Sequence, residues 1–133
     1  MSDSEQIRAM YQQVDREYGR IDILGNVAGN ARSGNPLEVS EADVEFTMKN
    51  LIVGRLVSCQ EAARRMIAAA KGSIINLISI AGITALGCNH LPYSMGMAGA
   101  AQMTRELSTE WSARGVRVNG IVCAQIMNQE LKE

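Results

Sequence analysis

An apolar run of strand length, residues 72–79 (Gly-Ser-Ile-Ile-Asn-Leu-Ile-Ser), constrains what this chain can fold into more than any other stretch. Its isoleucines and leucine point to both sides, which is typical of a strand buried on two faces of a parallel sheet. A loop then leads to Tyr93, at or near the start of a long helical pattern. Because ligands bind at the carboxyl ends of strands in open α/β sheets, we expect Ser79 and Tyr93 to face one crevice. A hydroxyl and a phenol in such a place indicate proton-transfer chemistry.

The rest of the chain continues this alternation of helix and strand. Apolar residues at helical spacing predict a first helix that ends at Tyr18, and further helices over residues 40–70 and 93–113. Shorter apolar runs predict strands over residues 21–27, 73–79 and 116–122. This order predicts an α/β fold, a partial Rossmann-like three-layer sandwich with about three parallel strands. Since no internal repeat or linker interrupts it, residues 1–133 are expected to form one partial domain.

Start and stop signals accompany the predicted helices. Ser2-x-x-Glu5 is typical of a capping box, and Gly19 fits the position just past a helix end. Ser40 predicts the N-cap of the second helix. Small residues over 98–101 predict close packing of the third helix against a neighbour.

The handedness of parallel crossovers predicts how the helices are arranged. Right-handed crossovers place the helices that begin near Ser40 and Tyr93 on the same face of the sheet. Only the first helix is then left for the other face. Apolar strand residues on that face, and the free strand edge, are expected to be poorly covered, which favours a partner or self-association.

Composition excludes several classes of function. The chain has 13 Lys and Arg against 14 Asp and Glu, a net charge of −1. Without a basic excess, the charge balance does not favour binding of nucleic acid. No apolar run approaches membrane-spanning length, and the charged amino end argues against a signal peptide. The three cysteines show no C-x-x-C spacing, which favours reduced thiols in a cytoplasmic protein. His90, the single histidine, has no ligand cluster near it, so no metal is expected.

Five short motifs, in order along nearly the whole chain, resemble those of the short-chain dehydrogenase/reductase family, classical type. They are Asn26-Val-Ala-Gly29, Lys49-Asn50-Leu51, Ile74-Ile-Asn-Leu-Ile-Ser79, Tyr93-x-x-x-Met97 and Arg117-Val-Asn-Gly-Ile121. Each motif alone is weak, whereas five in the family's order and spacing are specific. The resemblance places this sequence in the central-to-carboxyl portion of the family's fold, without the nucleotide-binding strands that come first in the family.

The resemblance implies an NAD(P)(H)-dependent oxidoreductase that interconverts small alcohols and carbonyl compounds. It assigns the general acid/base to Tyr93, polarisation of the carbonyl to Ser79, and support of a proton-relay water to Asn50. Without that role, Asn50 is expected to be a solvent-facing polar residue. Residual contacts to an NAD or NADP cofactor are assigned to three residues of the first motif, namely Asn26, Ala28 and Gly29.

Departures from the family pattern predict impaired activity. The family's lysine, four residues after the tyrosine, is replaced here by Met97, which carries no charge. Cys123 and Ala124 stand where the family has proline and glycine, and only Asn26 remains of two adjacent asparagines. No glycine-rich G-x-x-x-G-x-G turn occurs, so dinucleotide binding is expected to be weak or absent. The alternative is a non-catalytic relic or pseudoenzyme that serves as an oligomerisation or interaction module.

The resemblance also implies a homo-oligomer. In the family, the helices that correspond to residues 40–70 and 93–113 pack against the same pair of a second subunit as a four-helix bundle. Both helical patterns are intact in this sequence, with more apolar residues than one core-facing stripe requires.

Overall fold

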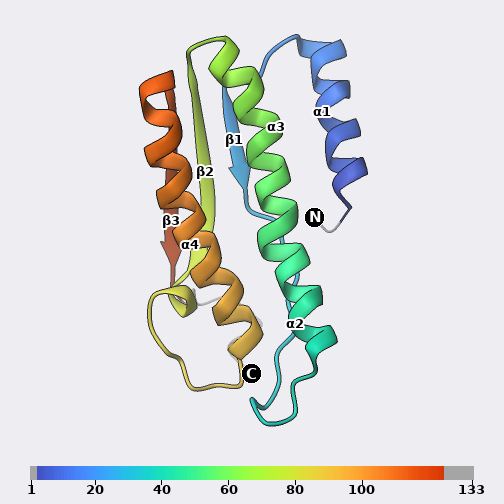
Figure 1. The fold of residues 1–133 in the computed structure, drawn as a ribbon, viewed down its shortest axis with the longest axis vertical. Coiled ribbons are helices and arrows are strands. Elements are labelled where there is room, and N and C mark those ends of the chain that lie inside the picture. Colours follow the sequence, from blue (N-terminus) through green and yellow to red (C-terminus); the bar gives the residue numbers. More distant parts are fainter. Residues whose placement is uncertain (1–2, 125–133) are drawn as a thin grey trace, which may run out of the picture.

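A computed structural model of the chain describes residues 3–124 (Figure 1). The elements follow one another as α1 (Ser4–Tyr18), β1 (Ile23–Asn26), α2 (Glu41–Met48), a π-helical turn (Lys49–Val53), α3 (Gly54–Ala68), β2 (Gly72–Ser79), a 3-10 turn (Ile80–Gly82), α4 (Leu91–Trp111), a second 3-10 turn (Ser112–Arg114) and β3 (Val116–Cys123). The predicted order of helices and strands is therefore confirmed. No helix within the described residues has the length and apolar character needed to cross a bilayer.

The three strands form one parallel sheet in the order β1-β2-β3. Asn26 at the end of β1 lies opposite Asn76, and Ile74 of β2 lies opposite Val118 of β3. Branched apolar side chains dominate β2 and β3, as is usual for strands that pack under helices. The predicted fold class, a partial Rossmann-like α/β fold with an open parallel sheet, is confirmed.

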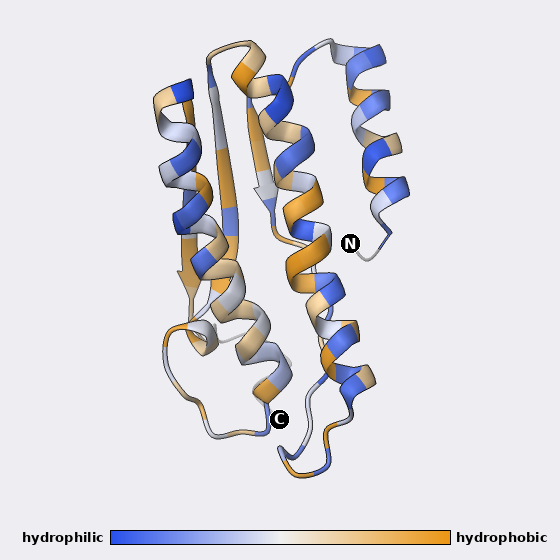
Figure 2. Ribbon diagram, in the orientation of Figure 1, coloured by the Kyte–Doolittle hydropathy of each residue, from blue (hydrophilic) through white to orange (hydrophobic). Residues whose placement is uncertain are grey.

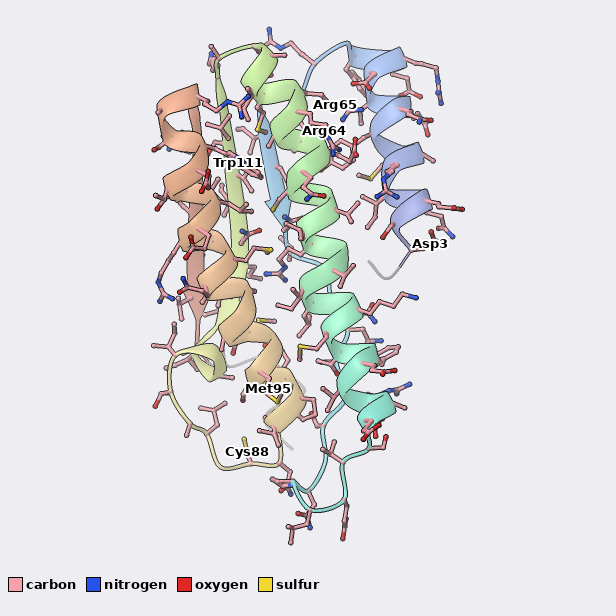
Figure 3. The ribbon with its side chains drawn as sticks, viewed as in Figure 1. Asp3, Arg64, Arg65, Cys88, Met95 and Trp111 are labelled. Atoms are coloured by element: carbon pink, nitrogen blue, oxygen red, sulfur yellow. The ribbon has the colours of Figure 1, made fainter. Side chains whose placement is uncertain are left out.

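Helix α1 lies beside α3 and does not cover the second face of the sheet (Figure 1). The Tyr11 hydroxyl and the Ser58 hydroxyl are hydrogen-bonded at 2.9 Å, and Arg65 of α3 donates from Nε to Asp15 at 2.6 Å. Figure 3 shows Arg65 reaching across to α1. The expectation that α1 occupies the opposite face is therefore wrong. The right-handed rule fixes only helices that connect two strands, and α1 follows no described strand.

The two faces of the sheet differ in how well they are covered. Ile74, Val116 and Val118 point toward the helices and are buried. Ile23 and Ile121 belong to the other face and remain 66% and 52% exposed. Figure 2 shows how apolar the strands are beneath the helix layer. The described residues thus cover one face of the sheet and leave apolar side chains on the other.

The predicted helix over residues 40–70 consists of three segments. Between α2 and α3, the Gly54 amide bonds to the Lys49 carbonyl, five residues back, which defines one π-helical turn. Helical spacing of apolar residues cannot reveal such a turn, because one extra residue barely alters the pattern. Asn50 lies inside this turn, is 5% exposed and donates to the Phe46 carbonyl at 2.9 Å. The expectation of a solvent-facing Asn50 is therefore wrong.

Helix ends follow the sequence signals, with small shifts. Asp3 caps α1 by accepting from the Glu5 amide at 3.0 Å, whereas Ser2 lies outside the described residues. Gly19 ends α1 with a φ of 68°, as expected. Ser40 and Asp43 form a capping box at the start of α2. Helix α4 begins at Leu91, before the expected start, because a proline in its first turn fits the helix without needing an amide.

Small residues let α4 approach the π-helical turn closely. A Cβ atom on Gly96 would lie 2.8 Å from Leu51 Cδ1, and one on Gly99 would lie 2.7 Å from Ile52 Cδ1. Ala100 and Ala101 on α4 are also buried. The predicted close packing at this part of the helix is confirmed, and it fixes the position of α4 relative to the π-helical turn.

Candidate active site

A pocket of about 240 Å³ lies where the three parallel strands end. Val27 just after β1, Ser79 at the end of β2 and Cys123 at the end of β3 all line it. Tyr93 and Met97 of α4 complete the wall on the helix side. The expectation that Ser79 and Tyr93 face one crevice is therefore confirmed as geometry, because the carboxyl ends of parallel strands meet at one edge.

Ser79 lines the pocket and is held in place by the turn that follows it. Its Oγ accepts a hydrogen bond from the Ala81 amide at 3.2 Å, which leaves the hydroxyl proton available for another acceptor. The turn itself is pressed onto α4, since a Cβ on Gly82 would lie 2.5 Å from the Met97 carbonyl carbon. Helix α4 thus supports the position of the serine.

Tyr93 lies half-buried in the first turn of α4. Its ring meets the His90 ring edge to face, with centroids 6.1 Å apart. His90 is in turn fixed by a 2.9 Å hydrogen bond between its Nδ1 and the Ser33 hydroxyl. No residue in the described range 3–124 forms a hydrogen bond with the phenol. The hydroxyl is therefore available for a molecule in the pocket.

Met97 lies one helical turn after Tyr93 and closes the pocket with an uncharged side chain. It is 7% exposed and packs with Leu51, Ile78 and Ala101. Its position next to the tyrosine is the one that the resemblance assigns to a lysine. A thioether there can fill space but supplies no ammonium group.

Arg55 is a wall residue that the sequence reading did not single out. It is 1% exposed, yet it lines the same pocket as Ser79 and Tyr93. Its Nη1 donates to the Leu77 carbonyl at 2.6 Å. Burial lowers the pKa of the Arg55 guanidinium, but arginine remains charged at neutral pH. The sequence did contain a signal for this position. Arg55 lies four residues after Leu51 and four before Cys59, so it belongs to the same apolar helix face as these two residues.

The remaining predicted site residues lie differently. Gly29 lines the pocket, whereas Asn50, Asn26 and Ala28 are not part of its wall. Asn50 is turned toward the Phe46 carbonyl of its own helix. The structure therefore gathers Ser79, Tyr93, Met97 and Gly29 from the predicted set.

Asn26 belongs to a buried polar network that fixes the end of β1. Its Nδ2 donates to Asn76 Oδ1 at 2.9 Å and to Cys59 Sγ at 3.1 Å, and Asn76 Nδ2 donates to Thr104 Oγ1 at 2.9 Å. Burial raises the pKa of the Cys59 thiol to about 11, so this thiol stays protonated at neutral pH. The network joins two strands to α3 and α4 and so supports the turn that carries Gly29. Residues 3–124 contain no cluster of His, Cys, Asp and Glu that could hold a metal ion.

Comparison with known proteins places this geometry in context. The family model described as short chain dehydrogenase matches residues 1–133. D-threitol dehydrogenase of Mycolicibacterium smegmatis is 37% identical over 121 residues, which cover 91% of this chain and 46% of that protein. NAD-dependent glycerol dehydrogenase of Listeria innocua is 31% identical over 94% of this chain and 49% of its own length.

A solved structure shares the fold closely. The gluconate 5-dehydrogenase of Burkholderia cenocepacia, in complex with NADP and tartrate, superposes with a TM-score of 0.89 at 26% identity. The match covers 96% of this chain and 50% of that one. The chain therefore spans about half the length of the relatives that it matches.

Proposed function

The chain belongs to the short-chain dehydrogenase family, and from this premise we propose that it carries the proton-transfer side of an NAD(P)(H)-dependent alcohol–carbonyl oxidoreductase site. The observation that carries the proposal is the shared pocket of Ser79 and Tyr93 at the carboxyl ends of the strands. In it, the Ser79 hydroxyl donates to the oxygen of a carbonyl substrate. The Tyr93 phenol gives that oxygen a proton in reduction and accepts one in oxidation. A bound nicotinamide cofactor supplies or accepts the hydride.

The pocket fits only one end of such a cofactor. Its volume of about 240 Å³ lies below the range of roughly 300–1,000 Å³ common for ligand sites. Ser79 and Tyr93 line the space that the reacting ring shares with the substrate. The 133 residues offer no glycine-rich turn whose amides would receive the pyrophosphate. The fit supports contact with the nicotinamide end and weak overall binding of NADH or NADPH.

The names of relatives support a small hydroxylated substrate. D-threitol, glycerol and gluconate, after which three similar proteins are named, are all small polyhydroxylated compounds. A pocket of this size, with a hydroxyl and a phenol in its wall, suits a substrate of that class.

The proposal predicts slow hydride transfer that depends on Tyr93, which NADPH oxidation measures. With NADPH at millimolar concentration and small ketones, we expect NADPH oxidation whose rate rises linearly with cofactor, because binding is weak. Tyr93→Phe should lower that rate about a hundred-fold, the usual contribution of a general acid. Tyr18→Phe, at an exposed phenol in α1, is the matched control and should leave the rate unchanged. Saturation at micromolar NADPH, or equal rates in both variants, would contradict the proposal.

Met97 favours a second candidate, a non-catalytic family relic that acts as an interaction module. The uncharged thioether stands where the family resemblance implies a cation beside the tyrosine. This candidate predicts no turnover above background at any cofactor concentration, in the parent chain and in Tyr93→Phe alike.

We also propose that the chain forms a homo-oligomer through its helix faces. Val53, Leu91 and Met95 are large apolar side chains left exposed on the helices that the family uses for association. Each such side chain, when buried, contributes about 1.5–3 kcal/mol of transfer free energy before entropic costs. The uncovered sheet face, with Ile23 and Ile121, offers a second surface through which further copies of the chain can associate.

Sedimentation velocity at micromolar concentration measures this association. We expect a dimer or larger species in the parent chain, because apolar helix faces are sequestered on association. Met95→Glu should shift the population toward monomer, whereas Glu110→Gln at the far end of α4 should not. A cooperative monomer throughout the concentration range would overturn the proposed assembly.

A further inference from the structure

The Arg55 guanidinium is a buried positive charge without a counter-ion among residues 3–124. The ion pairs of that part of the chain belong to other arginines, namely Arg8, Arg20, Arg64 and Arg65. The Arg55 Nε atom is buried and has no hydrogen-bond partner. Buried charges are costly unless they are paired, and residues 3–124 leave this group uncompensated.

A purely structural role explains only part of this arrangement. Pairing between β1 and β2 ends at Asn26 and Asn76, so no residue of β1 lies opposite Leu77, whose carbonyl needs a partner. Arg55 Nη1 satisfies this carbonyl at 2.6 Å. One carbonyl uses a single N–H of the five that arginine carries, and a neutral donor could serve it equally well. The charge itself remains unexplained.

The guanidinium stands in the wall of the Ser79–Tyr93 pocket. A Cβ on Gly29, another wall residue, would lie 3.9 Å from Arg55 Nη2, which places that nitrogen on the Gly29 side. Within residues 3–124, the ionisable groups that act on Arg55 are the Cys59 thiol and the Tyr93 phenol, and neither is a carboxylate. The pocket is therefore the place from which a negative charge can reach Arg55.

We infer that Arg55 binds an oxyanion in this pocket and that the small hydroxylated substrate carries a carboxylate. A guanidinium presents paired N–H donors that match the oxygens of a carboxylate or a phosphate. A pocket of about 240 Å³ suits a small hydroxy or oxo acid. The identity of the ligand as a substrate rests on the proposed function, whereas the binding of the oxyanion does not.

Lactate and lactamide make a matched pair of probes, since they differ in the carboxylate alone. We expect lactate to shift the Arg55 Nε–H signal in NMR spectra with low-millimolar affinity, and lactamide to bind at least about ten-fold more weakly. Inorganic phosphate, titrated in parallel, distinguishes a phosphate site from a carboxylate site. Tighter binding of phosphate than of lactate would assign the oxyanion to a nucleotide phosphate and overturn the substrate assignment.

Two variants separate specific pairing from general electrostatics. Arg55→Gln should weaken lactate binding at least about ten-fold, whereas Arg105→Gln, which removes an exposed charge on α4, should change it less than about two-fold. Arg55→Lys retains the charge and should retain part of the affinity. If Arg55→Gln does not fold, the comparison of lactate with lactamide on the parent chain still decides whether the pocket prefers a carboxylate. Equal affinity for the two probes, or unchanged lactate binding in folded Arg55→Gln, would overturn the inference.

These measurements need no nicotinamide nucleotide, so they are independent of turnover. A chain without Tyr93-dependent activity that prefers lactate to lactamide supports the oxyanion site and refutes the proposed function. An active chain that binds lactate and lactamide equally supports the proposed function and refutes the oxyanion site.

Discussion

Replacement of Gly115 by alanine is expected to destabilise the protein by about 2–5 kcal/mol, a large share of the stability of a single domain. Gly115 has a φ of 81° and connects the second 3-10 turn to β3. A left-handed conformation costs a non-glycine residue about 1–2 kcal/mol. In addition, a Cβ atom there would overlap the Ala70 carbonyl, which is backbone and cannot rotate away. Urea unfolding followed by circular dichroism measures the loss.

Gly19→Ala is the matched control for this substitution. Gly19 also follows a helix and has a φ of 68°, but no atom lies within 4 Å of the position its Cβ would take. The left-handed conformation alone should then cost about 1–2 kcal/mol. Equal losses in the two variants would show that the contact with Ala70 relaxes, and that packing at the start of β3 is looser than the structure indicates.

Met97→Lys is expected to destabilise the protein by about 3 kcal/mol at neutral pH, the scale of an uncompensated buried charge. The side chain is enclosed by Leu51, Ile78 and Ala101, and the charge of Arg55 already lies in the same pocket. The loss should shrink as the pH rises toward about 10.4, the ordinary pKa of lysine, because a neutral amine is less costly to bury. Urea unfolding at several pH values measures both effects.

The same substitution separates two possible causes of impaired catalysis. Met97→Lys restores a cation beside Tyr93 but adds no amides for a pyrophosphate, so we expect NADPH oxidation no faster than that of the parent chain. Met97→Leu, which keeps the volume and adds no charge, should cost less than about 1.5 kcal/mol and serves as the control for packing. A rate well above that of the parent chain in Met97→Lys alone would show that the missing cation, and not the weak binding of cofactor, limits the chain.

Local patterns were sufficient to predict the framework of the site. Apolar runs of strand length and helical spacing predicted the strands and helices, and a strand that ends in Ser79 before a helix that carries Tyr93 predicted their common crevice. Such features depend on residues close together in the chain, or on the general rule that parallel strands present their carboxyl ends at one edge. Glycine at position 19, likewise, could be read as a helix end from the sequence.

Other features depend on contacts between distant residues and could not be read from the sequence. The π-helical turn leaves the apolar spacing nearly unchanged, so the sequence did not show that Asn50 turns toward its own helix. The position of helix α1 beside α3 depends on the hydrogen bond between the Tyr11 and Ser58 hydroxyls, and these residues are 47 positions apart in the chain.

The sequence by itself determined the order of the elements, the parallel sheet and the meeting of Ser79 with Tyr93, because these follow from local periodicity and from strand direction. Only the tertiary structure decided that α1 shares a face with α3 and that Arg55 is enclosed in the pocket wall. An arginine in a helix reads the same whether it faces water or a pocket, and only the packing of β2 and α4 around α3 removes its solvent.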